Sequence, residues 1–102
     1  MSNAILECQL NRLAIKDYRD AREYYAARSP ATAAKFIDAV DAAVKRIIQA
    51  SDSLPVVSGK YRRVRVEKFP HSLVFYERAE HDVRIVAVAH PSRRPGYWRR
   101  RT

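Results

Sequence analysis

The final stretch of the sequence gathers side chains that are well suited to holding a phosphate or an acidic surface. Residues 90–101 read HPSRRPGYWRRR, and six of these twelve residues are Arg or His. Guanidinium groups donate paired hydrogen bonds to phosphate or carboxylate oxygens, and His and Tyr can transfer protons. The aromatic pair could also pack the tail onto the core, because burying such rings is strongly stabilising. The candidate binding residues of this stretch are His90, Arg93, Arg94, Tyr97 and Trp98.

Arg63 and Arg65 form a second cationic group. They lie in YRRVRVEKF (61–69), where Val alternates with charged residues. This period of two predicts a strand, so both arginines project from the same face of a sheet. If the valines face the helices, the arginines face the other way. They could bind a partner there, or they could form a surface ion-pair ladder with Glu67.

Cleavage of RNA without a metal would need a base, an acid and fixed positive charge beside the phosphate. Arginine supplies the charge, but its pKa, above about 12, makes it a poor base. The proton transfers would therefore fall to His71, His90 or Tyr97. The sequence has no CxxC or HExxH spacing, no glycine-rich phosphate loop and no GxSxG motif. We therefore expect no metal and no cofactor.

The positive charge belongs mainly to the second part of the chain. The net charge is +9, yet residues 1–59 hold eight basic and seven acidic residues. From Lys60 onward there are twelve basic residues against four acidic ones. A localised field of this kind favours an acidic partner such as nucleic acid or an acidic protein surface. A solvated basic surface is the alternative interpretation.

Length and composition predict one domain, residues 1–102, with a modest core of its own. The opening MSNA (1–4) is consistent with a remnant of an expression tag and carries no structural weight. Cys8 is the single cysteine, so it cannot close a disulfide within the chain. We find no signal-peptide pattern and no apolar run long enough to span a bilayer. These observations favour a cytoplasmic protein without membrane contact.

Hydrophobic periodicity predicts a strand, two helices and then further strands. Ser29 is a good helix N-cap and Pro30 is accepted in a first helical turn, so one helix ends here and another begins. The short break indicates a helical hairpin. The expected elements are a strand at 5–10, helices at 11–28 and 30–50, a loop at 51–60, a three-strand meander within 61–90 (61–69, 72–78, 83–89) and a basic tail at 91–102.

The order β-α-α-β-β-β predicts a two-layer α+β fold, in which the α-helical hairpin packs on a mainly antiparallel sheet. Each helix has one apolar face, and the sheet is the available partner to cover it. The first face comprises Leu10, Leu13, Ala14, Tyr18, Ala21, Tyr24 and Tyr25, and the second comprises Ala33, Phe36, Ile37, Val40, Ala43, Val44, Ile47 and Ile48.

Three stretches, DYRDAREYYAARSPATAAKFIDAV, KFPHSLVFYE and RIVAVAHPSRRPGYW, resemble the RelE/ParE superfamily of type II toxin-antitoxin toxins. The resemblance covers about residues 6–101, and its most specific parts are Phe69 to Tyr76 and Ala87 to Trp98. It implies a RelE/ParE-like fold and a small basic toxin. It also implies a cognate antitoxin, acidic and partly disordered, that folds across the toxin in a hetero-oligomer.

The superfamily implies two alternative activities. RelE-like members cut mRNA in the ribosomal A site, whereas ParE-like members inhibit DNA gyrase. Arg63 and Arg65 stand near two basic positions of the cutters, and Tyr97 matches their catalytic tyrosine. However, Ser72 and Pro91 stand where the cutters place arginines. These absent charges, together with the DYRDAREYYAARSP pattern, favour the ParE-like activity.

We therefore expect a toxin that binds DNA gyrase through its basic tail and through the sheet face that bears Arg63 and Arg65. The first alternative is a metal-independent, ribosome-dependent mRNA endonuclease. The second is a degenerate toxin without activity of its own, which serves as the antitoxin's partner or as a DNA-bound corepressor. The candidate catalytic residues of the endonuclease are Arg63, Arg65, His90 and Tyr97. The expectation requires the arginines beyond residue 60 to gather on one exposed surface next to Tyr97.

Overall fold

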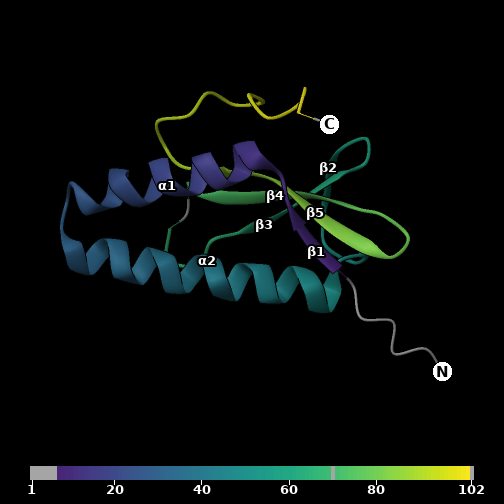
Figure 1. The fold of residues 1–102 in the computed structure, drawn as a ribbon, viewed down its shortest axis with the longest axis horizontal. Coiled ribbons are helices and arrows are strands. Elements are labelled where there is room, and N and C mark those ends of the chain that lie inside the picture. The colour runs from purple at the N-terminus through teal and green to yellow at the C-terminus, as the bar shows by residue number, and fades with distance from the viewer. Residues whose placement is uncertain (1–6, 70, 102) are drawn as a thin grey trace.

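The computed structural model describes residues 7–69 and 71–101 (Figure 1). Two helices follow a first short strand, and the remaining strands come after them, as the sequence predicts. The elements are β1 (Glu7–Leu10), α1 (Arg12–Ala26), α2 (Pro30–Ala50), β2 (Val56–Ser58), β3 (Tyr61–Arg65), β4 (Leu73–Arg78) and β5 (Asp82–Ala89).

The strands form one mixed sheet in the order β1-β5-β4-β3-β2. The pairs from β2 to β5 are antiparallel, whereas β1 lies parallel to β5. Helices α1 and α2 form the antiparallel hairpin, with α1 packed against β5 and α2 packed against β3 and β4 (Figure 1). The α+β fold, with a helical hairpin on a mainly antiparallel sheet, is thus confirmed.

Both helices begin at a capping residue, and at Ser29 this start is the one that the sequence predicts. The side chain of Asn11 accepts a hydrogen bond from the backbone N–H of Leu13 at 2.7 Å, and Ser29 Oγ accepts one from Thr32 N–H at 3.0 Å. Pro30 occupies the first turn of α2, where its missing N–H leaves no carbonyl unpaired. The Ser29 cap and Pro30 thus mark the point where the chain turns from α1 into α2.

The segment 51–60, predicted as a loop, contains a short strand. β2 pairs with β3 through Val56 opposite Arg62 and Ser58 opposite Tyr61, with a register shift between the two pairs. Three residues with an irregular register give little alternation of hydrophobicity, so the sequence pattern did not reveal this strand.

The strand predicted at 61–69 ends at Arg65. Beyond it the chain turns, because Phe69 N–H donates to the Val66 carbonyl at 3.0 Å. Lys68 takes a left-handed conformation, with φ of 68°. The predicted strand at 5–10 is observed from Glu7, and residues 5 and 6 lie outside the described part of the chain.

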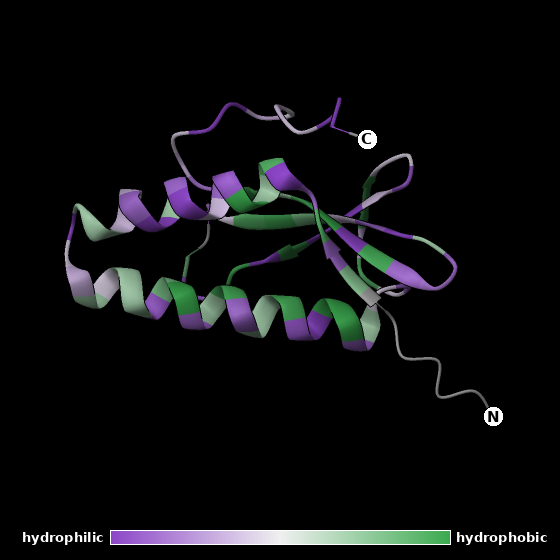
Figure 2. Ribbon diagram, in the orientation of Figure 1, coloured by the Kyte–Doolittle hydropathy of each residue, from purple (hydrophilic) through white to green (hydrophobic). Residues whose placement is uncertain are grey.

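The core between the helices and the sheet is built on the apolar face of α2, as the hydropathy colours show (Figure 2). On α1 the buried residues are Ala14, Asp17, Ala21 and Tyr25. The predicted stripe was therefore partly wrong, since Leu10 and Leu13 are 56% and 41% exposed while the acidic Asp17 is 2% exposed.

The opposite face of the sheet carries a second, smaller apolar cluster. Trp98 of the tail stacks on Phe75 of β4, with ring centroids 4.3 Å apart, and meets Tyr61 of β3 edge-on at 4.9 Å. Trp98 is 3% exposed. The tail is thus packed onto the sheet by its tryptophan, which is the structural role that the sequence offered for this residue.

None of the described helices combines the length and the apolar character that crossing a bilayer requires.

Candidate functional site

A cavity of about 800 Å³ lies between the outer face of the sheet and the tail. Its walls come from β3, β4, the end of β5 and the segment that follows β5. We call this cavity the arginine pocket. It is lined by Val57, Arg63, His71, Leu73, Phe75, Ala89, His90, Pro91, Arg93, Arg94, Pro95, Gly96, Tyr97, Trp98 and Arg99.

The arginine pocket has a cationic rim above a partly apolar floor. Leu73, Phe75 and Trp98 supply apolar surface, while the charged lining residues are all basic. No Asp or Glu lines the pocket within the described part of the chain. Because low-dielectric walls concentrate the field of like charges, such a cavity attracts anions. The cationic lining residues are Arg63, Arg93, Arg94 and Arg99, accompanied by His71 and His90.

The face of the sheet that bears Arg63 and Arg65 is the one that the alternation predicts. Val64 and Val66 are buried against the helices, so both arginines project to the outer face, where they are exposed. Arg63 lines the arginine pocket, whereas Arg65 lines a neighbouring hollow that Arg63 shares. Neither arginine pairs with Glu67 among the ion pairs of the described residues. The proposed ion-pair ladder is therefore not formed.

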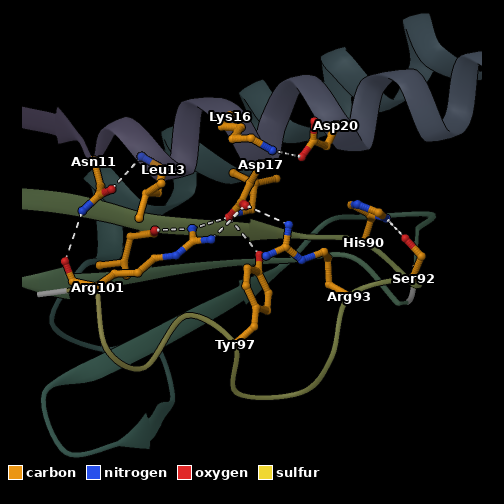
Figure 3. A network of polar contacts seen from close by, with 12 residues as sticks. Asn11, Leu13, Lys16, Asp17, Asp20, His90, Ser92, Arg93, Tyr97 and Arg101 are labelled. Carbon is orange, nitrogen blue, oxygen red and sulfur yellow. Dashed lines mark hydrogen bonds and ion pairs between the residues drawn. The ribbon is translucent and has the colours of Figure 1, made fainter.

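The buried carboxylate of Asp17 anchors the tail to α1 (Figure 3). Arg101 approaches it with both guanidinium nitrogens, Nη1 at 2.5 Å from Oδ2 and Nη2 at 3.1 Å from Oδ1. The Tyr97 hydroxyl donates to Oδ2 at 2.9 Å, and Arg93 Nη1 lies 3.6 Å from Oδ1. We call these four side chains the Asp17 clamp. It holds one side of the arginine pocket in place.

The clamp determines the chemistry available to Tyr97. Its hydroxyl is a committed donor to Asp17, and its ring lies 3.9 Å from the guanidinium carbon of Arg93 and 4.8 Å from that of Arg101. Burial, reinforced by the negative charge of Asp17, raises the pKa of Tyr97 far above its ordinary value. A phenol in this state is a very poor general base.

Asp17 and Arg101 were missed or misread in the sequence. Arg101 belongs to the predicted basic tail but was not among its candidate binding residues, yet its side chain is only 10% exposed in the pair with Asp17. The signal for Asp17 was its place between Ala14 and Ala21 on the apolar face of α1. An acidic residue at such a position needs a buried cation, and the arginine-rich tail is the richest source.

His90 lies at the pocket but is turned toward the protein. It is 6% exposed, its Nδ1 is 2.9 Å from Ser92 Oγ, and its ring centroid is 5.0 Å from that of Tyr24. Burial lowers the pKa of His90, and the positive charge of Arg93 lowers it further. Both effects favour the neutral form of His90. His71 is exposed and also lines the pocket.

Ser72 and Pro91 give no charge to this site. Ser72 is fully buried, and its Oγ lies 2.6 Å from the Tyr25 hydroxyl in the core. Pro91 lines the arginine pocket with an apolar ring. The two positions where the cutters place arginines therefore hold a buried hydroxyl and an uncharged wall.

Other arginines beyond residue 60 lie elsewhere. Arg62 donates to the Leu54 carbonyl at 2.6 Å, Arg78 donates to Ser51 Oγ at 2.8 Å, and Arg84 lies 3.4 Å from Glu77. The expected gathering of all these arginines on one surface was thus only partly right. The pocket and the adjoining hollow hold Arg63, Arg65, Arg93, Arg94 and Arg99.

The described residues contain no group of three His, Cys, Asp or Glu side chains placed to hold a metal ion.

Comparison with known proteins gives a consistent result. Residues 9–95 match the family model of the ParE toxin of the type II toxin-antitoxin system, parDE. A solved structure, described as the chromosomal ParDE TA system from P. aeruginosa, is similar in fold, with a TM-score of 0.74 at 15% sequence identity. The similarity covers 86% of this chain and 98% of that chain. No curated protein sequence gives a significant match.

Proposed function

Because the chain belongs to the ParE toxin family of type II toxin-antitoxin systems, we propose that it arrests growth by binding DNA gyrase and that a cognate antitoxin neutralises it. The observation that carries the proposal is the outer sheet face together with the adjoining tail. There Arg63 and Arg65 of β3 and Arg94 of the tail are exposed and have no carboxylate partner among the described residues. Unpaired arginines on a rigid sheet offer a docking surface for an acidic or DNA-associated region of gyrase.

The state of Tyr97 supports inhibition by binding rather than cleavage of mRNA. An endonuclease would need Tyr97 or His90 in contact with the reacting phosphate. The Tyr97 hydroxyl instead donates to Asp17, and its pKa is raised far above the ordinary value. Ser72, in place of a cutter's arginine, is buried against Tyr25. The charged groups of the pocket therefore suit electrostatic docking better than proton transfer.

Two surfaces support neutralisation by an antitoxin. The arginine pocket and its neighbouring hollow would attract an acidic segment. A second cavity of about 500 Å³ lies between α1 and α2, with an apolar lining that includes Leu10, Ile15 and Val44. It would accept the apolar face of a helix. An antitoxin that covered both would span the helical and the sheet sides of the toxin.

The test is a gyrase supercoiling assay with the purified toxin. We expect inhibition that is lost when Arg63 and Arg65 are both replaced by Gln, and retained when the exposed Arg19 and Arg22 of α1 are replaced instead. The two double variants lose the same charge, so they separate a local surface from net charge. Unaffected supercoiling at large toxin excess would refute the gyrase target, and ribosome-dependent mRNA cleavage would establish the endonuclease in its place.

A further inference from the structure

We propose that the arginine pocket is a binding site for the phosphate monoester of a nucleotide, either free or at the end of a single strand. The ligand would place its phosphate among Arg63, Arg94 and Arg99 and its sugar and base against the apolar floor. This inference goes beyond gyrase inhibition, and its test contains no gyrase.

The cationic rim selects the charge of the ligand. Four guanidinium groups and two imidazoles line one cavity, and no carboxylate of the described residues shares it. Guanidinium groups match phosphate oxygens bidentately. A phosphate monoester carries about −1.5 to −2 charge at pH 7, against −1 for an internal phosphodiester. Convergent cations therefore favour a terminal phosphate over one within a strand.

Not all the cations are equally available. Arg93 lies 3.6 Å from Asp17 and its guanidinium covers the Tyr97 ring, so it is already partly neutralised. Arg63 and Arg94 are exposed and take part in no ion pair among the described residues. Arg63 comes from β3 and Arg94 from the tail, and both line the cavity. An anion held between Arg63 and Arg94 would bind two guanidinium groups that form no ion pair with a carboxylate of the described residues.

The floor and the size of the cavity select the rest of the ligand. Leu73, Phe75, Ala89 and Trp98 supply apolar surface below the rim. A volume of about 800 Å³ falls within the range, roughly 300–1,000 Å³, of sites that enclose small molecules. An inorganic anion would leave most of this space unfilled, whereas a nucleotide adds a sugar and a base that can contact the floor.

The walls are rigid enough for such a site. Pro91 and Pro95 restrict the backbone on either side of the cationic residues of the tail. Gly96 adopts φ of 76°, which lets the chain turn back toward the sheet. The Asp17 clamp and the stacking of Trp98 on Phe75 then anchor the returning segment. A preformed cavity binds without the cost of ordering a loop.

The experiment uses the intrinsic signal of Trp98, which is the only tryptophan of the chain and lines the pocket. Its fluorescence and its indole N–H resonance are followed during titration with thymidine 5′-monophosphate and with the dinucleotide dTdT bearing or lacking a 5′-phosphate. We expect binding of both phosphorylated probes and at least a tenfold loss of affinity without the phosphate. The mononucleotide and the dinucleotide distinguish a free nucleotide from a strand end.

Matched variants localise the site. Replacing Arg63 and Arg94 by Gln should weaken binding of the 5′-phosphorylated dinucleotide about tenfold or more. Replacing Arg19 and Arg22, which lie on α1 and do not line the pocket, removes the same charge and should change affinity less than twofold. Equal losses in the two double variants would overturn the proposal, because they would reveal only a general attraction.

Three further outcomes would also overturn it. Equal affinity for the probes with and without the 5′-phosphate would show that the pocket does not recognise the phosphate. Equal affinity for inorganic pyrophosphate and for the nucleotide would show that the sugar and the base contribute nothing to binding. Tighter binding of a phosphoserine peptide than of either nucleotide would assign the pocket to a protein ligand instead.

Discussion

The guanidinium group of Arg101 and the carboxylate of Asp17 together take the place of a missing strand beside β5. β1 pairs with one side of β5 only as far as Ile85, while β4 pairs with the other side. Beyond Ile85, no strand of the described part of the chain pairs with the side of β5 that faces β1. Arg101 Nη1 donates to the Val86 carbonyl at 3.2 Å, and Val88 N–H donates to Asp17 Oδ2 at 3.1 Å. The ion pair thereby satisfies buried backbone groups that would otherwise lose their hydrogen bonds.

This arrangement predicts a large effect of Asp17→Asn on stability. The substitution would leave buried Arg101 and partly buried Arg93 without their counter-charge. Removing one partner of a buried pair costs about 3–5 kcal/mol, so we expect the free energy of unfolding to fall by about 3 kcal/mol. Urea denaturation followed by circular dichroism measures this change.

Asp20→Asn is the matched control for that experiment. Asp20 lies one turn further along α1 and pairs with exposed Lys16 at 3.0 Å. Exposed pairs of this spacing are worth about 0.3–0.5 kcal/mol. Equal denaturation midpoints for the two variants would show that the Asp17 clamp does not stabilise the fold.

The elements of the fold were largely predictable from the sequence, because most of them carry a local signal. Ser29 and Pro30 define the start of α2, and a clear apolar stripe runs along it. The change to a period of two then predicted β3, since a strand half-buried by helices alternates in hydropathy. The expected strands at 72–78 and 83–89 are instead apolar on both faces, as strands in the interior of a sheet are, and β4 and β5 are buried along most of their length. The short β2 has no such period, because its three residues pair irregularly at an exposed edge.

The candidate site was less predictable, because it depends on contacts across the whole chain. The sequence placed Arg63, Arg94 and Tyr97 in one functional group, and these residues do line one cavity. It could not show that Asp17, 84 residues before Arg101, would form an ion pair with that arginine of the tail. Local patterns carry no information on which of several arginines reaches a buried carboxylate.

The hydrogen bond between the hydroxyls of Tyr25 and Ser72 predicts that substitutions at these two positions change the free energy of unfolding non-additively. The two oxygens are 2.6 Å apart in the core, and each is the partner that the structure gives to the other. Ser72→Ala or Tyr25→Phe alone would leave one buried hydroxyl unsatisfied, at about 1–3 kcal/mol. The double variant removes both polar groups and should lose little more than either single variant.

A double-mutant cycle in urea measures this coupling directly. Ser53→Ala serves as the control, because Ser53 is an exposed residue whose hydroxyl donates a hydrogen bond to the Ala50 carbonyl at 3.1 Å. Additive losses for Tyr25→Phe and Ser72→Ala would contradict the expected coupling.

The lowered pKa of His90 predicts a specific dependence of stability on pH. Burial, followed by the charge of Arg93, lowers the pKa of His90 below the ordinary value of about 6.5, although Asp20 and Asp17 oppose the shift. Between the folded and unfolded pKa values the unfolded chain binds more protons. The free energy of unfolding should therefore fall as pH drops from about 7 through this window and stop falling, for this group, below the folded pKa.

The measurement is urea denaturation at a series of pH values for the wild type and His90→Gln. The difference between the two curves isolates the contribution of His90 from that of the carboxylates, which titrate at lower pH. His81→Gln, in an exposed turn, is the matched control substitution. A His90→Gln curve parallel to that of the wild type would show that His90 is protonated equally in both states.

The salt dependence of antitoxin binding tests how the two proposed surfaces share the interaction. The Debye length falls from about 10 Å at 0.1 M to about 3 Å at 1 M ionic strength. Binding of an acidic segment at Arg63 and Arg94 should therefore weaken strongly over this range, while apolar contacts near Ile15 should persist.

We expect Arg63→Gln with Arg94→Gln to flatten the salt dependence, and Ile15→Ser to weaken binding at every salt concentration. Calorimetric titration of the toxin with its cognate antitoxin measures both slopes. An affinity that stays constant from low to high salt would refute the electrostatic surface and leave the apolar groove as the site of neutralisation.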